Sequence, residues 1–363
     1  MIYLLVFLIS TYFIYLGEKN YKKNNKKTAV VFCLIAILLP SLLAGLRIEG
    51  IGTDTLYYVK ANFKVAVASK SFQQFNNAYE LELFYNLLVY FVSRFTNNIH
   101  VLYFLIQTII MFFVYRACYN ERKNVPMWLS FLLFLLLYYN RSLNMVRQSI
   151  ALAIILYAYK YIKEKKLLKY IIFVIIASFF HKTALLSLII YFMVALIKGK
   201  EKFLYKIFIL LISILFLIGY QEIMFFLIGL EIIPNKYLFY VTGSQSTILL
   251  IELIRKIIFL GIFTLFGKAL YKINEENHIL KYFMNLDIVL YLVGIYANYA
   301  QRISYYLGYF DIFLIAQLPN CCKKGVSKQI IYALIVIFFV SYWLMYYVIL
   351  GYDSTFPYIS ILN

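Results

Sequence analysis

Charged residues are scarce in this chain. Only 14% of its 363 residues are charged, 64% are hydrophobic, and the mean hydropathy is +0.80. A soluble domain of this length cannot cover its surface with so little charge, so the composition excludes that class. The short alternating strands of an outer-membrane barrel are also absent. Apolar runs long enough to cross a membrane recur instead, which predicts a polytopic helical membrane protein.

Cysteine is also sparse, and the usual cofactor motifs are missing. The four cysteines form no CxxC pair and no Cys/His spacing, so we expect free thiols and no metal site. Gly50 and Gly52 lack the preceding strand and the third glycine of a dinucleotide fingerprint, and there is no P-loop. We therefore expect no cofactor and no nucleotide-sugar site. The first apolar run lacks a basic start and a cleavage site, so we expect a retained helix and not a signal peptide.

Basic residues outnumber acidic ones by 35 to 16, and the net charge is +19. This excess does not indicate nucleic-acid binding, because the basic residues are grouped in short clusters between apolar runs, where they are typical topology signals. Most of the lysines and arginines fall in six clusters, at 17–27, 116–124, 160–169, 198–206, 268–281 and 320–328.

Placing all six clusters on the cytoplasmic side gives about twelve crossings, with both termini outside. The stretch 170–197 begins and ends at lysine clusters, so we predict two unequal helices that meet at His181 as a broken pair. Residues 81–95 do not fit as a span and are expected to form an amphipathic helix at the outer surface. The prediction is an all-α helical bundle with one transmembrane domain, 1–363, in which 47–99 form an outer loop and interfacial helix. The other expected spans are 2–16, 28–46, 100–118, 127–139, 149–162, 207–220, 248–271, 286–297, 303–319 and 330–350.

Four arginines at the ends of apolar runs are the strongest functional signal: Arg47, Arg141, Arg147 and Arg302. In this topology each lies on the outer side, where positive charge is normally sparse. An arginine at mid-membrane depth costs roughly 2.5–3.5 kcal/mol. A guanidinium also matches phosphate in a forked, two-bond geometry. We therefore predict that the four arginines form one site for a membrane-borne anion, such as a lipid pyrophosphate.

The segment NRSLNMVRQ forms the tip of the hairpin expected between 127–139 and 149–162. On one continuous helix, Arg141, Asn144, Arg147 and Gln148 would lie within an arc of about 120°. Two guanidiniums and two amides on one face suit an oxyanion-rich ligand. The alternative is a solvated helix end with snorkelling arginines.

The segment NYAQRISYYLGY repeats this pattern. On a helix, Asn298, Arg302, Tyr305 and Tyr309 would lie within about 60° of one another. Tyrosines stack on sugars, but they also form the aromatic belts of membrane interfaces. The segment therefore predicts a second substrate contact at Arg302, with the role of the tyrosines left open.

Two further places carry titratable groups that suit proton transfer. Arg47, Asp54 and Tyr57 lie on a glycine-punctuated turn, where Asp54 is either a general base or the ion-pair partner of Arg47. His181 lies at the expected helix break and is either a structural residue or a group for proton transfer or phosphate contact.

Glu252, Arg255 and Lys256 lie inside an apolar run. Their spacings of three and four residues bring opposite charges within reach on a helix. We expect an internal ion pair that faces the bundle and takes no part in catalysis.

The motifs also occur in a specific order along nearly the whole chain. They are Arg47 with Gly52-Thr53-Asp54 and Tyr57, then Glu82-Leu83-Phe84-Tyr85, NMVRQ at 144–148, Phe180-His181, Arg302 with its tyrosines, and Pro357-Tyr358 after Asp353. In this series the chain resembles the EpsG-type, Wzy-like polysaccharide polymerases. It lacks the large outer loop of some Wzy proteins.

The resemblance implies a GT-C-like membrane glycosyltransferase that uses polyprenyl-pyrophosphate-linked oligosaccharides. Such enzymes join repeat units on the outer face of the bacterial cytoplasmic membrane into capsule, exopolysaccharide or O-antigen, and release undecaprenyl pyrophosphate. The expected partners are these lipid-linked substrates, membrane lipids and other polysaccharide-assembly proteins such as a flippase or chain-length regulator, and not nucleic acid. We expect Arg141, Arg147 and Arg302, with Arg47, to hold the pyrophosphates.

A base must accept the proton of the attacking sugar hydroxyl. The candidates are His181, Asp54 and Glu82, in that order. The alternative functions are a flippase for the same lipid-linked unit and a lipid-dependent ligase, and a purely structural role is third.

Overall fold

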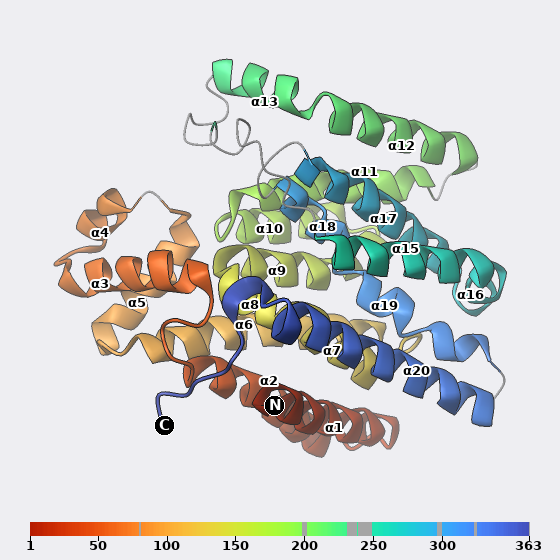
Figure 1. The fold of residues 1–363 in the computed structure, drawn as a ribbon, viewed down its shortest axis with the longest axis horizontal. Coiled ribbons are helices and arrows are strands. Elements are labelled where there is room, and N and C mark those ends of the chain that lie inside the picture. Colours follow the sequence, from red (N-terminus) through yellow and green to blue (C-terminus); the bar gives the residue numbers. More distant parts are fainter. Residues whose placement is uncertain are drawn as a thin grey trace. The chain divides into compact units, whose positions relative to one another are not determined.

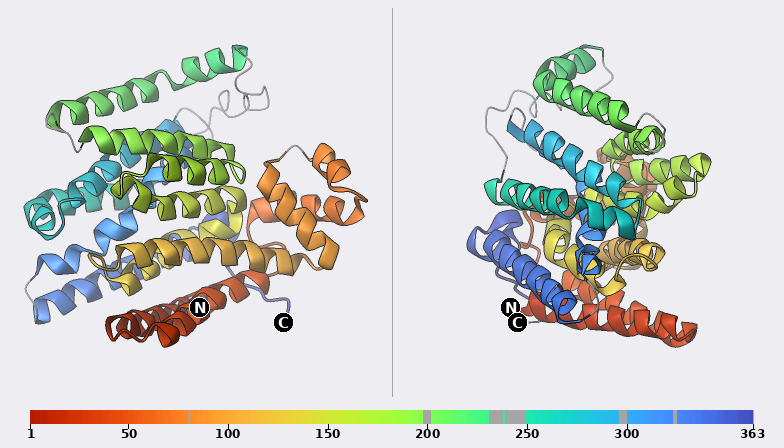
Figure 2. Two further views of the ribbon diagram at one scale, coloured as in Figure 1. Left: turned by 180° about the vertical axis from the view of Figure 1, so that it is seen from behind. Right: turned by 90° about the vertical axis from the view of Figure 1, so that its right-hand side faces the viewer.

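The computed structural model describes residues 1–79, 81–197, 202–230, 238, 249–295, 300–322 and 325–362. Within these ranges the regular elements are helices, and one isolated β-bridge joins Arg47 and Ser360 (Figures 1 and 2). The chain forms two compact units. Unit 1 comprises residues 1–185 and 322–363, and unit 2 comprises residues 186–321.

Five described helical segments are long and apolar enough to cross a membrane: Ile2–Lys22 (α1), Lys26–Gly45 (α2), Ile99–Glu121 (α6), Asn277–Ile295 and Val326–Ile349. A bent pair, Leu210–Phe216 with Tyr220–Gly229, would make a sixth. The chain is therefore an all-α membrane protein. The count of about twelve crossings and the GT-C-like arrangement stay predictions.

In unit 1, α1 and α2 form a close antiparallel hairpin at the bottom of Figure 1. Gly17 permits this approach, because a Cβ atom there would lie 2.6 Å from Cys33 Sγ. The Ser10 hydroxyl also donates to the Ala36 carbonyl oxygen at 2.5 Å. The hairpin continues into the core through α6, which packs on α2 and on α9 (Val146–Lys163), and α10 (Leu167–Ser178) covers α9.

The predicted hairpin tip is buried at the centre of unit 1. The first arm consists of α7 (Met127–Phe134), the π-helical η2 (Leu135–Tyr139) and α8 (Asn140–Asn144). The helix then breaks at Met145, whose ψ of 58° is not helical, before α9 begins. The expectation of one continuous helix through Arg141 and Gln148 is therefore wrong, because Arg141 and Asn144 precede the break while Arg147 and Gln148 follow it.

The last helical segment and the C-terminal tail hold this tip in place. They comprise α20 (Val326–Trp343), η8 (Leu344–Ile349) and the short turn η9 (Tyr352–Ser354). The Trp343 indole donates to Asn140 Oδ1 at 2.8 Å, and the Tyr347 hydroxyl donates to the Leu137 carbonyl oxygen at 2.9 Å.

The segment after α2 folds as a group of short helices: η1 (Thr55–Val59), α3 (Lys60–Ala68), α4 (Phe72–Ala78) and α5 (Leu83–Phe95). These helices lie together near the start of α6 (Figure 1). Helix α5 corresponds to the amphipathic helix expected at 81–95, since it is short and has one exposed apolar face.

The expected helix break at His181 is present. Helix α10 ends at Ser178, and the 3₁₀ helix η3 begins at Lys182 and runs to Ser187. The Phe180 and His181 amides both donate to the Ala177 carbonyl oxygen, which closes the end of α10.

Unit 2 continues the helical architecture. Its described elements are α11 (Leu188–Ile197), α12 (Lys202–Ile218), α13 (Tyr220–Gly229), α15 (Leu250–Leu265), α16 (Gly267–Ile273), α17 (Asn277–Tyr291), η5 (Leu292–Ile295), η6 (Ala300–Ile303), α18 (Tyr305–Gly308), α19 (Asp311–Ile315) and η7 (Leu318–Cys321). The span expected at 303–319 is therefore not one continuous helix. Its backbone turns at Tyr309–Phe310, and Gly308 at that turn is so close to α17 that a Cβ atom would lie 3.0 Å from an Asp287 oxygen.

Candidate functional site

Arg47 connects the end of α2 to the buried hairpin tip. Its side chain is 2% exposed, and its guanidinium donates to the Leu143 carbonyl oxygen at 3.4 Å and to the Thr55 hydroxyl at 3.5 Å. The guanidinium carbon also lies 4.3 Å from the centre of the Tyr103 ring. Among the described residues no ion pair joins Arg47 to Asp54, so the ion-pair alternative for Asp54 is wrong. The buried cation is instead held by neutral acceptors and an aromatic face, which makes it a structural support for the site.

Asn144 joins three segments that are far apart in the sequence. Its side-chain oxygen accepts hydrogen bonds from the Thr53 hydroxyl at 3.1 Å and the Asp54 amide at 2.8 Å. Its side-chain nitrogen donates to Asp353 Oδ1 at 3.2 Å. Gly52 allows this approach, since it has a φ of +88° and a Cβ atom would lie 2.8 Å from the hairpin-tip backbone. The Gly-Thr-Asp motif is thus explained by close backbone contact with the hairpin tip.

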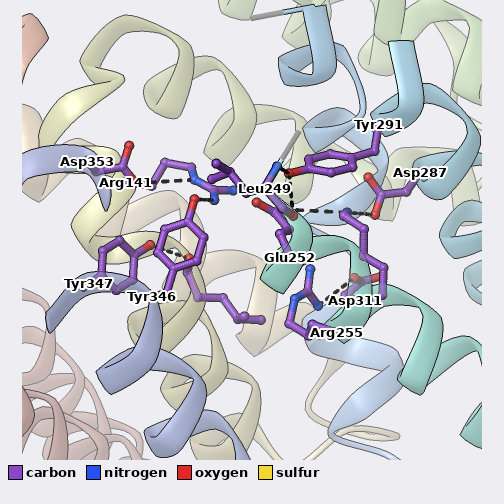
Figure 3. Close-up of polar contacts among 12 residues, drawn as sticks. Arg141, Leu249, Glu252, Arg255, Asp287, Tyr291, Asp311, Tyr346, Tyr347 and Asp353 are labelled. Carbon is purple, nitrogen blue, oxygen red and sulfur yellow. Dashed lines mark hydrogen bonds and ion pairs between the residues drawn. The ribbon is translucent and has the colours of Figure 1, made fainter. Parts of the chain in front are cut away.

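Arg141 lies in α8, the helix that also contains Asn144, and its side chain is 2% exposed (Figure 3). It donates to the Tyr346 hydroxyl at 2.6 Å, and its Nε atom lies 3.8 Å from Asp353 Oδ2. Asp353 therefore contacts both Arg141 and Asn144, which brings the C-terminal tail to the residues of the NMVRQ motif. A nearly buried guanidinium with a carboxylate at this distance is a preorganised charge pair.

A second polar cluster in unit 1, partly accessible to solvent, consists of Glu82, Arg147 and His181. The Glu82 carboxylate forms an ion pair with the Arg147 guanidinium, and its other oxygen lies 3.4 Å from His181 Nδ1. The Lys182 amide donates to that same oxygen at 3.3 Å. The side chains of Arg147 and His181 are 31% and 23% exposed, whereas that of Glu82 is 6% exposed. A buried carboxylate thus holds a cation and an imidazole that both reach the surface.

Burial alone would raise the pKa of Glu82. The nearby His181 imidazole and the positive charge of Arg147 outweigh burial and lower this pKa to about 2. Glu82 is therefore ionised at neutral pH and is a weak base. Glu82 lies at the N-terminus of α5, and His181 lies at the break after α10. These positions explain how two residues about a hundred positions apart in the sequence meet here.

The remaining predicted residues of unit 1 differ in exposure. Gln148 is 6% exposed, whereas Tyr57 on η1 is 69% exposed. Asp54 is half-buried at the start of η1. The structure therefore brings Arg47, Asn144 and Asp54 together through direct or shared contacts, and it brings Arg147, Glu82 and His181 together in a second cluster.

Unit 2 contains a buried charge cluster (Figure 3). Lys256 on α15 pairs with Asp287 on α17, and Arg255 Nη1 lies 3.4 Å from Asp311 Oδ2 on α19. The expected internal contact between Lys256 and Glu252 is present at 4.0 Å. All five side chains are at most 2% exposed. The sequence pattern identified the inward-facing charges, but two of the acidic partners come from other helices.

Arg302 and its tyrosines also belong to unit 2. Arg302 lies in η6 and is half-buried, while Tyr305 and Tyr309 are 4% and 1% exposed. These tyrosines are buried in unit 2 and do not form an exposed aromatic belt. Asn298 lies outside the described residues. The backbone changes from 3₁₀ to α-helix at this point, so the expected common arc of one helix does not apply.

The motif series of the sequence can now be compared with known families. The model of the EpsG family matches residues 30–360, nearly the whole chain. The chain belongs to the EpsG family. Membership makes this EpsG protein a polysaccharide-polymerase-like membrane protein with the character of a glycosyltransferase. No curated protein and no solved structure matches the chain.

Some residues of this EpsG protein's candidate site had little signal in the sequence. Asp353 is the clearest case, because it lies in a loosely patterned tail and its contacts with Arg141 and Asn144 span more than two hundred residues. Its φ of 63° is rare outside glycine, and this conformation aims the carboxylate at the hairpin tip. Thr55 is another, since its hydroxyl donates to the Leu143 carbonyl oxygen at 2.6 Å. Only the proximity of Thr55 to the Gly-Thr-Asp motif could have indicated it.

Proposed function

We propose that this protein joins oligosaccharide repeat units carried on polyprenyl pyrophosphate at the outer face of the bacterial cytoplasmic membrane. A hydroxyl of the acceptor unit attacks the reducing-end carbon of the donor chain. A new glycosidic bond forms, the bond between that carbon and the pyrophosphate oxygen breaks, and undecaprenyl pyrophosphate leaves. The cluster of Glu82, Arg147 and His181 carries the proposal, because it combines a cation and a base at one accessible position.

In this reaction His181 accepts the proton of the attacking hydroxyl. A neutral imidazole nitrogen can accept a proton from a hydroxyl, which suits this task. Glu82 accepts the hydrogen of His181 Nδ1 and leaves Nε2 directed to the substrate, as a carboxylate does for a histidine base. The present distance of 3.4 Å is long, and catalytic hydrogen bonds commonly tighten when substrate binds. Asp54 is the second candidate base, whereas Glu82 is too acidic to serve.

Arg147 binds the departing pyrophosphate. Negative charge grows on the leaving group as the bond breaks, so a fixed cation stabilises the transition state more than the ground state. Arg47 and Arg141 are nearly buried and support the positions of the 47–55 turn and the hairpin tip, while they add positive potential. Gln148 and Tyr57 are further proposed substrate contacts in unit 1. Arg302 and Tyr305 stay predicted substrate contacts within unit 2.

A flippase for the same lipid is less well supported. A transporter for an anionic headgroup would favour cations without carboxylate partners, distributed along the depth of the spans. In unit 2, the buried cations Arg255 and Lys256 each pair with a carboxylate. A ligase that transfers the chain to another acceptor would use the same chemistry and differs only in its product.

Reconstitution of the purified protein with a defined lipid-linked repeat tests the proposal. Polymer formation supports it, and addition of substrate to only one leaflet identifies the active face. Transfer of the lipid between leaflets without polymer would establish the flippase instead. His181→Gln should abolish polymerisation while the protein still binds the lipid, since the variant removes the base and leaves Arg147 in place.

A further inference from the structure

Helix α5 has an exposed apolar stripe that starts beside the proposed site. Leu83, Leu87, Phe91 and Phe95 are 41%, 40%, 61% and 75% exposed. They follow one another at intervals of four residues, so they form one continuous stripe along the helix surface. We call these four residues the α5 stripe.

The opposite face of α5 is packed into the protein. Tyr85, Val89 and Val92 are at most 3% exposed. The far end is fixed by Arg94, which donates to the carbonyl oxygens of Ala66 at 2.5 Å and Ser69 at 3.0 Å. These contacts hold α5 against α3, so the stripe is a rigid surface.

Helix α5 is too short to cross a bilayer. Its 13 residues extend about 20 Å, whereas the hydrocarbon core is about 30 Å thick. A short helix with one packed face and one exposed apolar face lies along a membrane interface. The stripe is therefore a surface that suits contact with acyl or prenyl chains.

The start of the stripe coincides with the polar cluster. Leu83 directly follows Glu82, which pairs with Arg147 and lies beside His181. The Phe84 amide donates to the Phe179 carbonyl oxygen at 2.9 Å, and their rings lie 4.7 Å apart. An amphiphile with its anionic head at Arg147 would therefore have the first part of its tail at Leu83.

We propose that the α5 stripe is a binding track for the polyprenyl tail of the donor lipid. This inference rests on the proposed function, because it takes the headgroup to be a pyrophosphate bound at Arg147. The track is about 18 Å long from Leu83 to Phe95, which matches several consecutive prenyl units. A long polyprenyl chain is too long to extend straight into one leaflet, so a surface that directs it along the interface would accommodate its length. The site would thereby select long-tailed donors over short-tailed ones.

Kinetics with two donors that differ only in tail length test the track. We expect wild-type protein to show a KM about tenfold or more lower for a long polyprenyl donor than for a short prenyl donor. The double variant Leu87→Asn, Phe91→Asn should lose most of this ratio, because KM for the long-tailed donor rises. The matched control is Leu5→Asn, Leu8→Asn on α1, whose side chains are 59% and 56% exposed on another apolar face. The control should keep the wild-type ratio.

A direct labelling experiment separates this inference from the proposed function. A polyprenyl pyrophosphate with a photoreactive tail should label α5 of the wild-type protein, and unlabelled polyprenyl pyrophosphate should compete while phospholipid should not. Labelling spread equally over α1 and α5, or labelling that phospholipid displaces, would mean contact with bulk lipid only and would overturn the track. If α5 is labelled but wild-type protein makes no polymer, the track stands and the proposed polymerase fails.

Discussion

Substitution of Glu82 by Gln provides a quantitative test of the Glu82, Arg147 and His181 cluster. The pKa of Glu82 is about 2 against its usual 4.5, as the attraction of His181 and Arg147 outweighs the cost of burial. A difference of that size corresponds to roughly 3 kcal/mol in favour of the ionised carboxylate in the folded protein. Glu82→Gln removes this charge and should destabilise the protein by up to about that amount at pH 7.

The pH dependence follows from the direction of the pKa change. Because the folded protein lowers the pKa of Glu82, the stabilisation is complete above pH 4.5 and is lost as the pH falls toward 2. Thermal unfolding in detergent should therefore show a gap between wild type and Glu82→Gln that is full at pH 7 and narrows below pH 4.5. Polymerisation should fall by about 10²–10⁴-fold, because His181 loses the group that orients it.

A surface carboxylate provides the matched control. Glu164 pairs with Lys166 at 2.7 Å, and both side chains are exposed, so Glu164→Gln should change stability and activity little. Glu82→Asp should recover part of the activity. If Glu82→Gln unfolds and polymerises like Glu164→Gln, the cluster has no special role and the reasoning is refuted.

Three further substitutions test the framework of the two units by thermal unfolding. Gly52→Ala should lower the free energy of unfolding by about 1–3 kcal/mol, because Gly52 has a left-handed backbone and a Cβ atom would collide with the hairpin tip. Gly50→Ala should leave it unchanged, because the surroundings of Gly50 are open. Asn144→Ala should lower the free energy of unfolding by about 1–3 kcal/mol and reduce activity, because the Asp54 amide loses its acceptor. An unchanged unfolding temperature would contradict this role of Asn144. Asp287→Asn should lower the free energy of unfolding by about 3–5 kcal/mol, because the buried Lys256 loses its nearest carboxylate and keeps only Glu252 at 4.0 Å. The double variant Asp287→Asn, Lys256→Met should recover stability; an equally unstable double variant would count against this pair.

Local patterns in the sequence predicted the local features of the fold. The amphipathic spacing at 81–95 predicted α5, and the interruption of an apolar stretch at His181 predicted the break after α10. The apolar runs predicted an all-α membrane protein. Each of these features depends on residues within one or two helical turns, so a single sequence contains the necessary information.

Long-range contacts were harder to predict. The break at Met145 separates Arg141 from Arg147, and neither proline nor glycine marks it in the sequence. The contact of Asp353 with the hairpin tip depends on packing of the tail. Two of the three base candidates, His181 and Glu82, were identified as separate residues, but only the fold shows that they are neighbours.

The affinity of the purified protein for polyprenyl pyrophosphate, compared with polyprenyl monophosphate, tests the central claim most directly. The account predicts that wild type prefers the pyrophosphate, that Arg147→Gln loses this preference, and that Arg116→Gln in the basic cluster at 116–124 keeps it. Equal affinities for the two lipids in wild type, or an unchanged preference in Arg147→Gln, would contradict the account.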